Sequence, residues 1–317
     1  LLSDDAAAAL AYWDFNTVVR LDVAARQSET DEFYSLLQRI REGDIRASDW
    51  EFLKQRNLQS LPREEQAQFK DAIRLMSTKK AVEEFNLDRV QRCPGKVARL
   101  QAEHNKPEAR AKKADAFQGL KSEVHIAVGA QAMLKANKWQ EAGLVNGQIG
   151  FVRAIIYDRG LRPPSLPKAL IVEFPNYIGP GWNDLPRHVA LPAERVNHPK
   201  QDLHRTQFPI DLAYALTIHK SQGITIGDGQ PIQKVVIDVG DREQSAGLSF
   251  VALSRAKDLS CLAFDPMPSL KRLQTISTLK QLQFRKQHDE ELIRIAENVA
   301  QENLHLVVND TEFNTPP

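Results

Sequence analysis

Cysteine is scarce in this sequence, long apolar runs are missing, and neither sign of charge dominates. Of the 317 residues only two are cysteine, Cys93 and Cys261, and they lie too far apart for the paired spacing of a zinc site or a redox motif. We therefore expect no metal site in the chain and a reducing, intracellular setting. The sequence holds no apolar run of the roughly 18 residues that a membrane-spanning helix needs, so we expect no membrane partner.

The charges nearly cancel: Lys and Arg together number 42 against 41 Asp and Glu, which gives a net charge of +1. Overall charge therefore argues neither for nor against nucleic acid, and any path for DNA has to be a local basic strip. The hydrophobic share of 42% is that of an ordinary globular protein. The sequence begins without an initiating Met or a signal-peptide pattern, so we expect the numbering to start inside a longer protein.

Residues 1–95 alternate between strand and helix patterns. Apolar positions between 30 and 56 recur at helical spacing, and Gly43 is placed to end the first helix. The expected elements are a strand at 17–23, the helix that ends at Gly43, a second helix with Ser48 as its N-cap, a strand at 72–77 and a helix from Lys79 to about Val90. Strand-then-helix order is typical of an α/β layer.

The pattern changes after residue 95. Residues 96–113 carry six Lys or Arg against two Glu with little apolar periodicity, which predicts a basic, mobile linker over 96–117. Short β-branched or aromatic segments follow, separated by turn-forming Gly, Pro and Asn; they lie at 124–134, 147–158, 169–174 and 187–191. This spacing indicates a small antiparallel barrel over 118–205.

The α/β pattern returns at about Thr206 and continues to 266. It predicts a helical stretch after Thr217, a strand at 233–239, a helix at 246–256 and a strand at 259–264. The barrel is therefore expected to be inserted within a single α/β domain. Leucine and isoleucine at three-residue steps after 267 predict C-terminal helices that end in a tail at 317.

The sharpest motif is DLAYALTIHKSQGIT, residues 211–225. An apolar run there ends in the hydroxyl of Thr217, the imidazole of His219 and the ammonium of Lys220, a set that suits the binding of phosphate. Gly223 would let the backbone approach a ligand closely. Taken alone, His219 is more often a structural histidine, and Ser-Gln-Gly is more often a simple turn.

A second motif is AGLSFVALSRAK, residues 246–257. Helical projection puts Arg255 on one stripe with Leu248, Val251 and Ala252, so its guanidinium needs an anionic partner. That partner is either a carboxylate of the same domain or a γ-phosphate reached across a cleft. Arg26, with Gln27 beside it after the 17–23 segment, poses the same question, and a surface arginine is the commoner interpretation there.

These motifs resemble those of the Pif family of superfamily-1, 5′-to-3′ DNA helicases. LTIHKSQGIT resembles motif V, FVALSRA resembles motif VI, and Arg26-Gln27 resembles the Arg-Gln of motif IV. The segments FYSLLQRIREGDI, LMSTKKAVEEFN and AGLVNGQIGFV extend the resemblance over nearly the whole chain. It implies the C-terminal half of such a motor: a RecA-like, P-loop NTPase-like α/β domain with an inserted SH3-like β-barrel and C-terminal helices, preceded by the end of the first RecA-like domain.

The resemblance also assigns roles to residues. Arg26 and Arg255 would stabilise charge on the γ-phosphate as catalytic residues, with Gln27, Gln222 and Gly223 at the nucleotide. The residues expected to bind DNA are Thr78, Lys79, Lys135, Trp139, Thr217, His219 and Lys220, with Lys138 as a further candidate. Trp139 could equally be part of the barrel core. The implied partners are single-stranded DNA and the N-terminal RecA-like domain of the same protein, in a monomeric enzyme.

Two features depart from the family pattern. No GxxxxGK[ST] loop and no paired Asp-Glu of Walker B type occur, so ATP and Mg²⁺ are expected to be held mainly by an N-terminal half, and this chain alone is predicted to be inactive. The connection at 227–231 is longer than usual for the family. Alternatives are a single-stranded DNA-binding fragment without catalysis and an RNA-directed, RecD-like or mobile-element motor. The resemblance implies genome maintenance in the nucleus or mitochondrion: replication, repair, recombination or telomere upkeep.

Overall fold

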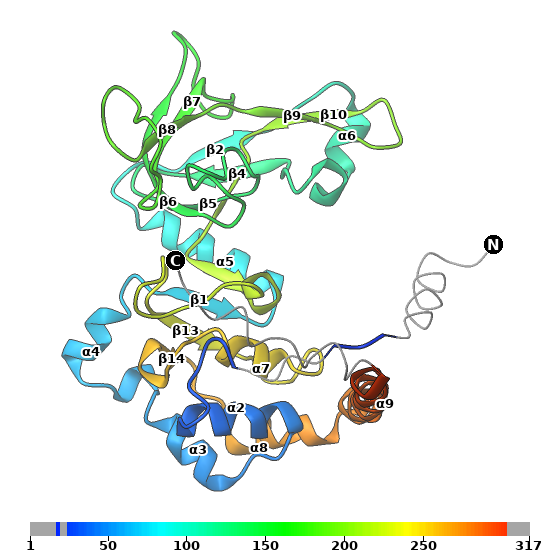
Figure 1. Cartoon of the computed structure of the whole chain (residues 1–317). Coiled ribbons are helices and arrows are strands. Elements are labelled where there is room, and N and C mark those ends of the chain that lie inside the picture. The colour runs from blue at the N-terminus through cyan, green and yellow to red at the C-terminus, as the bar shows by residue number, and fades with distance from the viewer. Residues whose placement is uncertain (1–16, 20–23, 303–317) are drawn as a thin grey trace, which may run out of the picture. The chain divides into compact units, whose positions relative to one another are not determined.

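A computed structural model describes residues 17–19 and 24–302 of the chain (Figure 1). The chain divides into two compact units. The helical unit comprises the described parts of Leu1–Trp50 and Ser269–Pro317 together with Arg242–Gly247. The main unit comprises Glu51–Asp241 and Leu248–Pro268. No helix among the described residues has the length and apolar character needed to cross a membrane.

The helical unit is built on α2, Glu32–Glu42, which forms where the apolar spacing predicts it. Asp31 caps its first turn by accepting the N–H of Phe33 at 2.9 Å, and Gly43 ends it in the left-handed region with φ +71°. A Cβ on Gly43 would lie 2.8 Å from the side chain of Leu282, so glycine is required on two counts. The unit also contains the predicted C-terminal helices: α8, Leu270–Gln274; the 3₁₀ turn Thr275–Thr278; and α9, Lys280–Glu302.

Two predictions for this unit need correction. The second helix, α3 at Ala47–Lys54, begins before Ser48, so Ser48 is not its N-cap. Asp49, in the first turn of α3, reaches back to the residue before the helix: its carboxylate accepts the N–H of Arg46 at 2.9 Å and a guanidinium N–H of Arg39 at 2.6 Å. The strand predicted at 17–23 does not appear at 17–19, and its remaining residues, 20–23, lie outside the described part of the chain.

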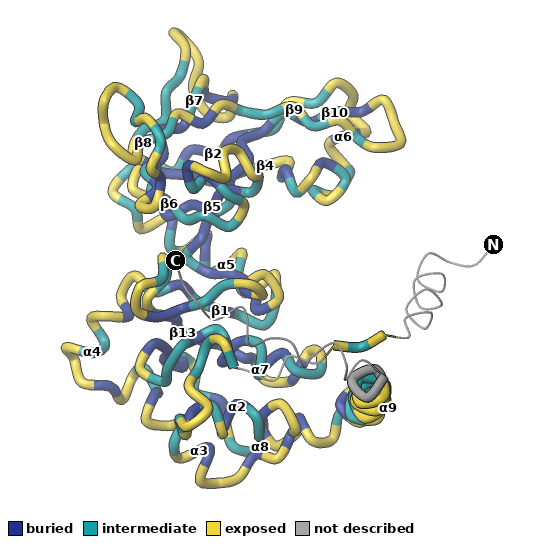
Figure 2. The backbone as a smooth tube through the Cα atoms, viewed as in Figure 1, coloured by how far each residue is buried: buried dark blue, intermediate teal, exposed yellow. Residues whose placement is uncertain are grey.

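The main unit contains a four-stranded parallel sheet in the order β12-β1-β13-β14. Its strands are β1, Ile73–Met76; β12, Ala215–Thr217; β13, Val235–Asp238; and β14, Leu262–Phe264. β12 and β14 are buried at every residue, and β13, labelled in Figure 2, is buried at its first three. Such burial is typical of the strands of a parallel sheet. The helices of this part are α4, Arg63–Gln68; α5, Lys79–Gln91; and α7, Leu248–Leu253. The predicted α/β layer is confirmed.

An antiparallel region lies between α5 and β12 in the sequence, as predicted for an insertion. Its largest sheet has the order β11-β5-β6-β7-β8. These strands are β5, Gln131–Leu134; β6, Ile149–Ile156; β7, Ala169–Glu173; β8, His188–Leu191; and β11, Ile210–Leu212. Smaller sheets join β2, Ala98–Gln101, to β4, Glu123–Ile126, and β10, His204–Gln207, to β3, Glu103–His104, and β9, Glu194–Asn197. In the described residues β8 and β11 are sheet edges and do not pair with each other.

The segment 96–117 is not a linker. It forms β2, β3, the helix α6 at Pro107–Ala111 and a 3₁₀ turn at Ala114–Phe117. The reason is Arg205, which is fully buried and donates to the carbonyls of Leu120 and Ala109, each at 2.7 Å. Its guanidinium also lies over the ring of Phe117, 4.4 Å from the centroid. The buried guanidinium of Arg205, on β10, thus fixes the conformation of a segment that is itself rich in basic residues.

Other boundaries also move. Antiparallel pairing continues through β11 to Leu212, so the parallel sheet resumes at Ala215 and not at 206. The helical stretch expected after Thr217 is only a 3₁₀ turn, Ile218–Ser221. The helix predicted at 246–256 is shortened to α7, and the strand predicted at 259–264 begins with a 3₁₀ turn before β14.

Candidate nucleic-acid interface

The carboxyl ends of β1 and β12 lie side by side, with Met76 opposite Thr217 in the parallel register. Each strand end is followed by a threonine-capped turn. Thr78 caps α5 by accepting the N–H of Ala81 at 3.2 Å, and Thr217 caps the 3₁₀ turn by accepting the N–H of Lys220 at 3.4 Å. Thr78 directly precedes Lys79, and Thr217 lies three residues before Lys220. Both turns lie at the carboxyl edge of a parallel sheet, where ligands usually bind.

Asn86 fixes α5 against β12. Its side-chain amide donates to the carbonyl of Ala215 at 3.0 Å, and its oxygen accepts the N–H of Ala215 at 2.8 Å. Asn86 is buried, so both bonds form away from water, where an unpaired polar group would be costly. The helix that begins at Lys79 is thereby held in register with the strand that ends at Thr217.

A cavity of about 610 Å³ opens beside these strand ends, and its charged lining consists of five lysines and four carboxylates, Glu83, Asp115, Glu123 and Asp211. We call it the lysine cleft and define it by its five lysines, Lys79, Lys113, Lys121, Lys135 and Lys220. Thr217 lines it as well. Four of the residues predicted to bind DNA therefore meet in one place. Lys113 and Lys121 were missed, because the basic stretch that holds the first was interpreted as a linker.

The lysines are close enough to affect one another. Burial lowers the pKa of Lys220, and the neighbouring charge of Lys135 lowers it further. Asp211 opposes this effect; it pairs with Lys121 at 2.6 Å and with Lys220 at a longer 3.9 Å. Lys79, Lys113 and Lys135 form no ion pair with any carboxylate of the described residues. Each of these three ammonium groups can therefore pair with an anion that enters the cleft.

Four other predicted residues lie outside the cleft lining. Thr78 is the N-cap of α5, and a DNA contact by Thr78 stays a prediction. His219 is exposed on the 3₁₀ turn. Trp139 is 46% exposed, so the interpretation as barrel core is wrong; its ring meets that of Tyr177 edge to face at 6.4 Å. Lys138 forms an ion pair with Glu194 of β9. A stacking role for Trp139 and DNA contacts by His219 and Lys138 stay predictions.

The two arginines belong to different units. Arg26 and Gln27 are half-buried in the irregular segment before α2, in the helical unit. Arg255 belongs to the main unit, but it is not on the buried stripe of its helix, because α7 ends at Leu253. Its Nε donates to the carbonyl of Val251 at 2.9 Å and its Nη2 to the hydroxyl of Ser254 at 3.0 Å. These local bonds orient a half-buried guanidinium at the helix end.

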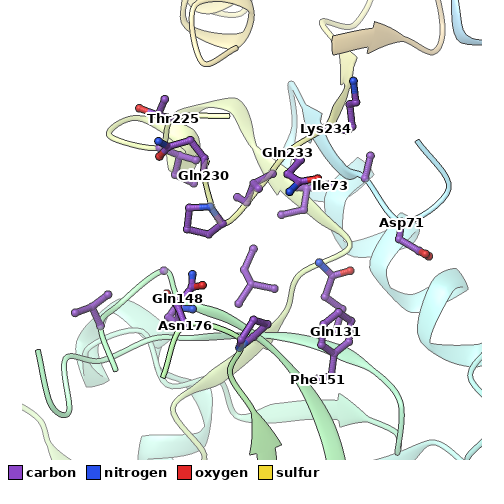
Figure 3. A pocket seen from close by; sticks show the side chains of 18 of the residues that line it. Asp71, Ile73, Gln131, Gln148, Phe151, Asn176, Thr225, Gln230, Gln233 and Lys234 are labelled. Carbon is purple, nitrogen blue, oxygen red and sulfur yellow. The ribbon is translucent and has the colours of Figure 1, made fainter. Parts of the chain in front are cut away.

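Gly223 is needed for its backbone conformation. Its φ is +87°, and a Cβ there would meet nothing within 4 Å, so the position is open. Gln222 beside it is exposed. Gly223 lines a second cavity of about 580 Å³ on the main unit, drawn in Figure 3, and not the lysine cleft.

The long connection at 227–231 is anchored to the arginine segment. The N–H of Ile226 donates to the carbonyl of Arg255 at 2.9 Å, and the N–H of Lys257 donates to the carbonyl of Ile226 at 2.8 Å. The side chain of Lys257 reaches the carbonyl of Asp228 at 2.8 Å. Residues 227–231 therefore form an ordered surface turn, and the hydrogen bonds beside this turn hold the backbone of Arg255 in place.

Comparison with known proteins gives one consistent result. The chain is 32% identical over 262 residues to the human ATP-dependent DNA helicase PIF1, a match that covers 80% of this chain and 36% of the human protein. The chain thus spans about a third of that relative's length. No protein-family profile matches it.

Solved structures agree with this result in fold. The crystal structure of the Pif1 helicase from Candida albicans matches with a TM-score of 0.62 at 22% identity, over 85% of this chain and 60% of that one. Bacteroides Pif1 bound to ssDNA matches with a TM-score of 0.56 at 21% identity, over 86% and 57%. The parallel sheet of the main unit is accordingly RecA-like. Along about four-fifths of its sequence and in its fold, the chain is similar to Pif1 helicases.

Proposed function

We propose that this chain is the DNA-gripping half of an ATP-dependent DNA helicase that moves 5′ to 3′ on single strands. The observation that carries the proposal is the lysine cleft, which joins Lys79, Lys135, Thr217 and Lys220 at the carboxyl edge of a RecA-like sheet. The human relative is named an ATP-dependent DNA helicase, and the Bacteroides relative was crystallised with ssDNA.

The cleft binds a strand mainly through its phosphates. Lysine ammonium groups neutralise phosphates and release counterions, a contact that carries no sequence information. A motor that must move along DNA of any sequence needs contacts of this sequence-independent kind. The exposed ring of Trp139 supplies a surface on which a base of the same strand can stack, since stacking is also tolerant of sequence. The antiparallel insertion that carries Lys135 and Trp139 is then the SH3-like module of the family.

ATP and Mg²⁺ are held mainly by a nucleotide-binding domain of the same protein, because the printed sequence contains no GxxxxGK[ST] loop. From this chain Arg26 and Arg255 supply positive charge to the γ-phosphate, with Gln27, Gln222 and Gly223 near the nucleotide. The fit of Arg255 rests on its orientation by Val251 and Ser254. A planar guanidinium so placed can stabilise charge that develops on the transferring phosphoryl group.

In the cell we propose a monomeric enzyme of DNA repair and recombination, acting in the nucleus or mitochondrion. The test has two parts. The 317-residue chain should bind single-stranded DNA more tightly than duplex or RNA of the same length. The protein completed with its nucleotide-binding domain should unwind a duplex with a 5′ tail, and only in the presence of ATP. Unwinding from a 3′ tail alone would contradict the proposed direction.

A second candidate is a DNA-binding module without catalysis, and the missing phosphate-binding loop favours it. Such a module would bind single strands through the same cleft. The ATPase rate of the natural gene product, measured with and without single-stranded DNA, separates the two: a DNA-stimulated rate supports the helicase, and no ATP turnover with intact strand binding supports the module.

A further inference from the structure

The cavity of about 580 Å³ in Figure 3 has an unusual lining. Most of its polar side chains are carboxamides. We call it the carboxamide pocket and define it by its seven carboxamide residues, Gln68, Gln131, Asn146, Gln148, Asn176, Gln230 and Gln233. They come from α4, from β5, from the turn before β6, from the segment after β7 and from the connection before β13. The pocket thus lies wholly within the main unit.

Gln131 is the residue that points to a ligand. It is 9% exposed, and its backbone N–H donates to the hydroxyl of Tyr214 at 3.2 Å. Its side-chain amide, in contrast, has no hydrogen-bond partner among the described residues, and it is aimed into the pocket (Figure 3). The amide is not among the fully buried side-chain groups, so solvent reaches it in the empty pocket. A molecule that enters the pocket can replace that solvent and hydrogen-bond to the Gln131 amide.

The chemistry of the lining selects the ligand. Each carboxamide offers a donor and an acceptor without charge, and the pocket includes only one cation, Lys234, and one carboxylate, Asp71. A phosphate or a metal ion would find little here. The ring of Phe151 and the flat faces of Pro175 and Pro231 favour a planar guest. A nucleobase has both properties: flat faces, and an edge of alternating donors and acceptors that Gln and Asn recognise.

The pocket also adjoins the lysine cleft. Gln131 lines the pocket and Met133 lines the cleft, and the two residues are next neighbours on one face of β5. Side chains two residues apart on a strand are separated by about 7 Å. Lys135 follows β5 directly, so a DNA strand held at Lys135 passes the end of the same β-strand that carries Gln131.

We propose that the carboxamide pocket receives an unpaired base of the strand held in the lysine cleft. The proposal rests on the proposed function, since it takes the cleft to bind single strands. The pocket adds a contact to a base, whereas the cleft binds the DNA strand through its phosphates. Strand binding by this chain then depends on the presence of bases and not on charge alone.

Two oligonucleotides of equal length and charge test the pocket, one of deoxyadenosine and one with abasic sites in place of its central bases. Their dissociation constants are measured with the 317-residue chain. The base-containing strand should bind about 5- to 100-fold more tightly, the range for a good bidentate contact to a base. Gln131→Leu and Gln148→Leu should each reduce this difference and leave the affinity for the abasic strand unchanged. Gln283→Leu, on α9 of the helical unit, is the matched control and should change nothing.

Several results would overturn the proposal. Equal affinity for both strands, with normal salt dependence, would refute the pocket and leave the cleft intact. Equal loss for both strands in both variants, with unchanged melting temperatures, would show that these glutamines shape the cleft and read no base. Salt-independent binding of both strands would instead refute the proposed function itself. Micromolar binding of free adenosine without any preference between strands would assign the pocket to a free nucleoside.

Discussion

Lys220→Gln should change how strand binding depends on salt. The substitution removes one charge from the lysine cleft and keeps a polar side chain of similar length. Four of the five lysines are available to phosphate, because Lys121 is held by Asp211 at 2.6 Å whereas Lys220 is 3.9 Å from the same carboxylate. Each phosphate contact to a single strand contributes about −0.7 to the slope of log K against log salt.

The expected slope is therefore about −2.8 for the wild-type chain and about −2.1 for the variant. Between 50 and 200 mM salt the affinity should fall about fiftyfold in the first case and about twentyfold in the second. Fluorescence anisotropy of a labelled oligothymidine, titrated at several salt concentrations, measures both slopes.

Lys200→Gln is the control for this prediction. Lys200 is an exposed lysine of the same unit that does not line the cleft, so its loss should leave the slope unchanged. If Lys200→Gln lowered the slope as much as Lys220→Gln, the strand would be attracted by general charge and the assignment to the cleft would be refuted. An unchanged slope in Lys220→Gln would refute it equally.

Three further predictions concern other parts of the chain. In the complete enzyme, Arg255→Ala should lower DNA-stimulated ATPase by roughly 10³- to 10⁵-fold with normal strand binding, and Arg255→Lys should rescue little; a lowered melting temperature with normal turnover would make the residue structural. Asn86→Ala removes both hydrogen bonds to Ala215 and should lower the free energy of unfolding in urea by about 2 kcal/mol or more. It should also weaken binding of single-stranded DNA, because α5 is no longer fixed to β12. Unchanged stability would contradict the role of Asn86 in fixing this register. Burial, and then the charge of Arg205, lower the pKa of His104 in the folded chain, so the free energy of unfolding should fall as pH drops below about 6.5, where the unfolded chain takes up the proton first. His104→Gln should flatten that part of the plot of stability against pH. An equally steep plot for the variant would contradict the assignment to His104.

The sequence alone was sufficient where a single local rule decides the structure. The spacing of Phe33, Leu36 and Ile40 and the position of Gly43 predict α2 and its end, since a helix needs one apolar face and a residue that accepts positive φ. Strands were predicted at 72–77, 233–239 and 259–264, where β1, β13 and β14 form, whereas no strand was predicted at β12. The meeting of Lys79, Thr217 and Lys220 followed from the family resemblance.

Contacts distant in sequence decided the rest. Nothing within 96–117 shows that Arg205 will be buried against its carbonyls, so a basic stretch was interpreted as a linker. Lys113 was not predicted as a residue of the cleft, because it lies in that stretch. Arg255 was placed on a buried stripe because helical projection assumes that the helix continues, whereas α7 ends at Leu253. The carboxamide pocket has no sequence signal, since its glutamines are scattered over separate elements.

Photo-crosslinking of a single DNA strand to the chain, followed by mass spectrometry of the crosslinked peptides, shows whether the strand lies in the lysine cleft. An oligonucleotide of halogenated deoxyuridine is bound to the 317-residue chain at low salt and irradiated. We expect crosslinks in the peptides that contain Lys79, Lys135 and Lys220, and loss of those crosslinks when all three lysines are changed to glutamine. Crosslinks concentrated on α9 or elsewhere in the helical unit, and unaffected by the triple substitution, would contradict it.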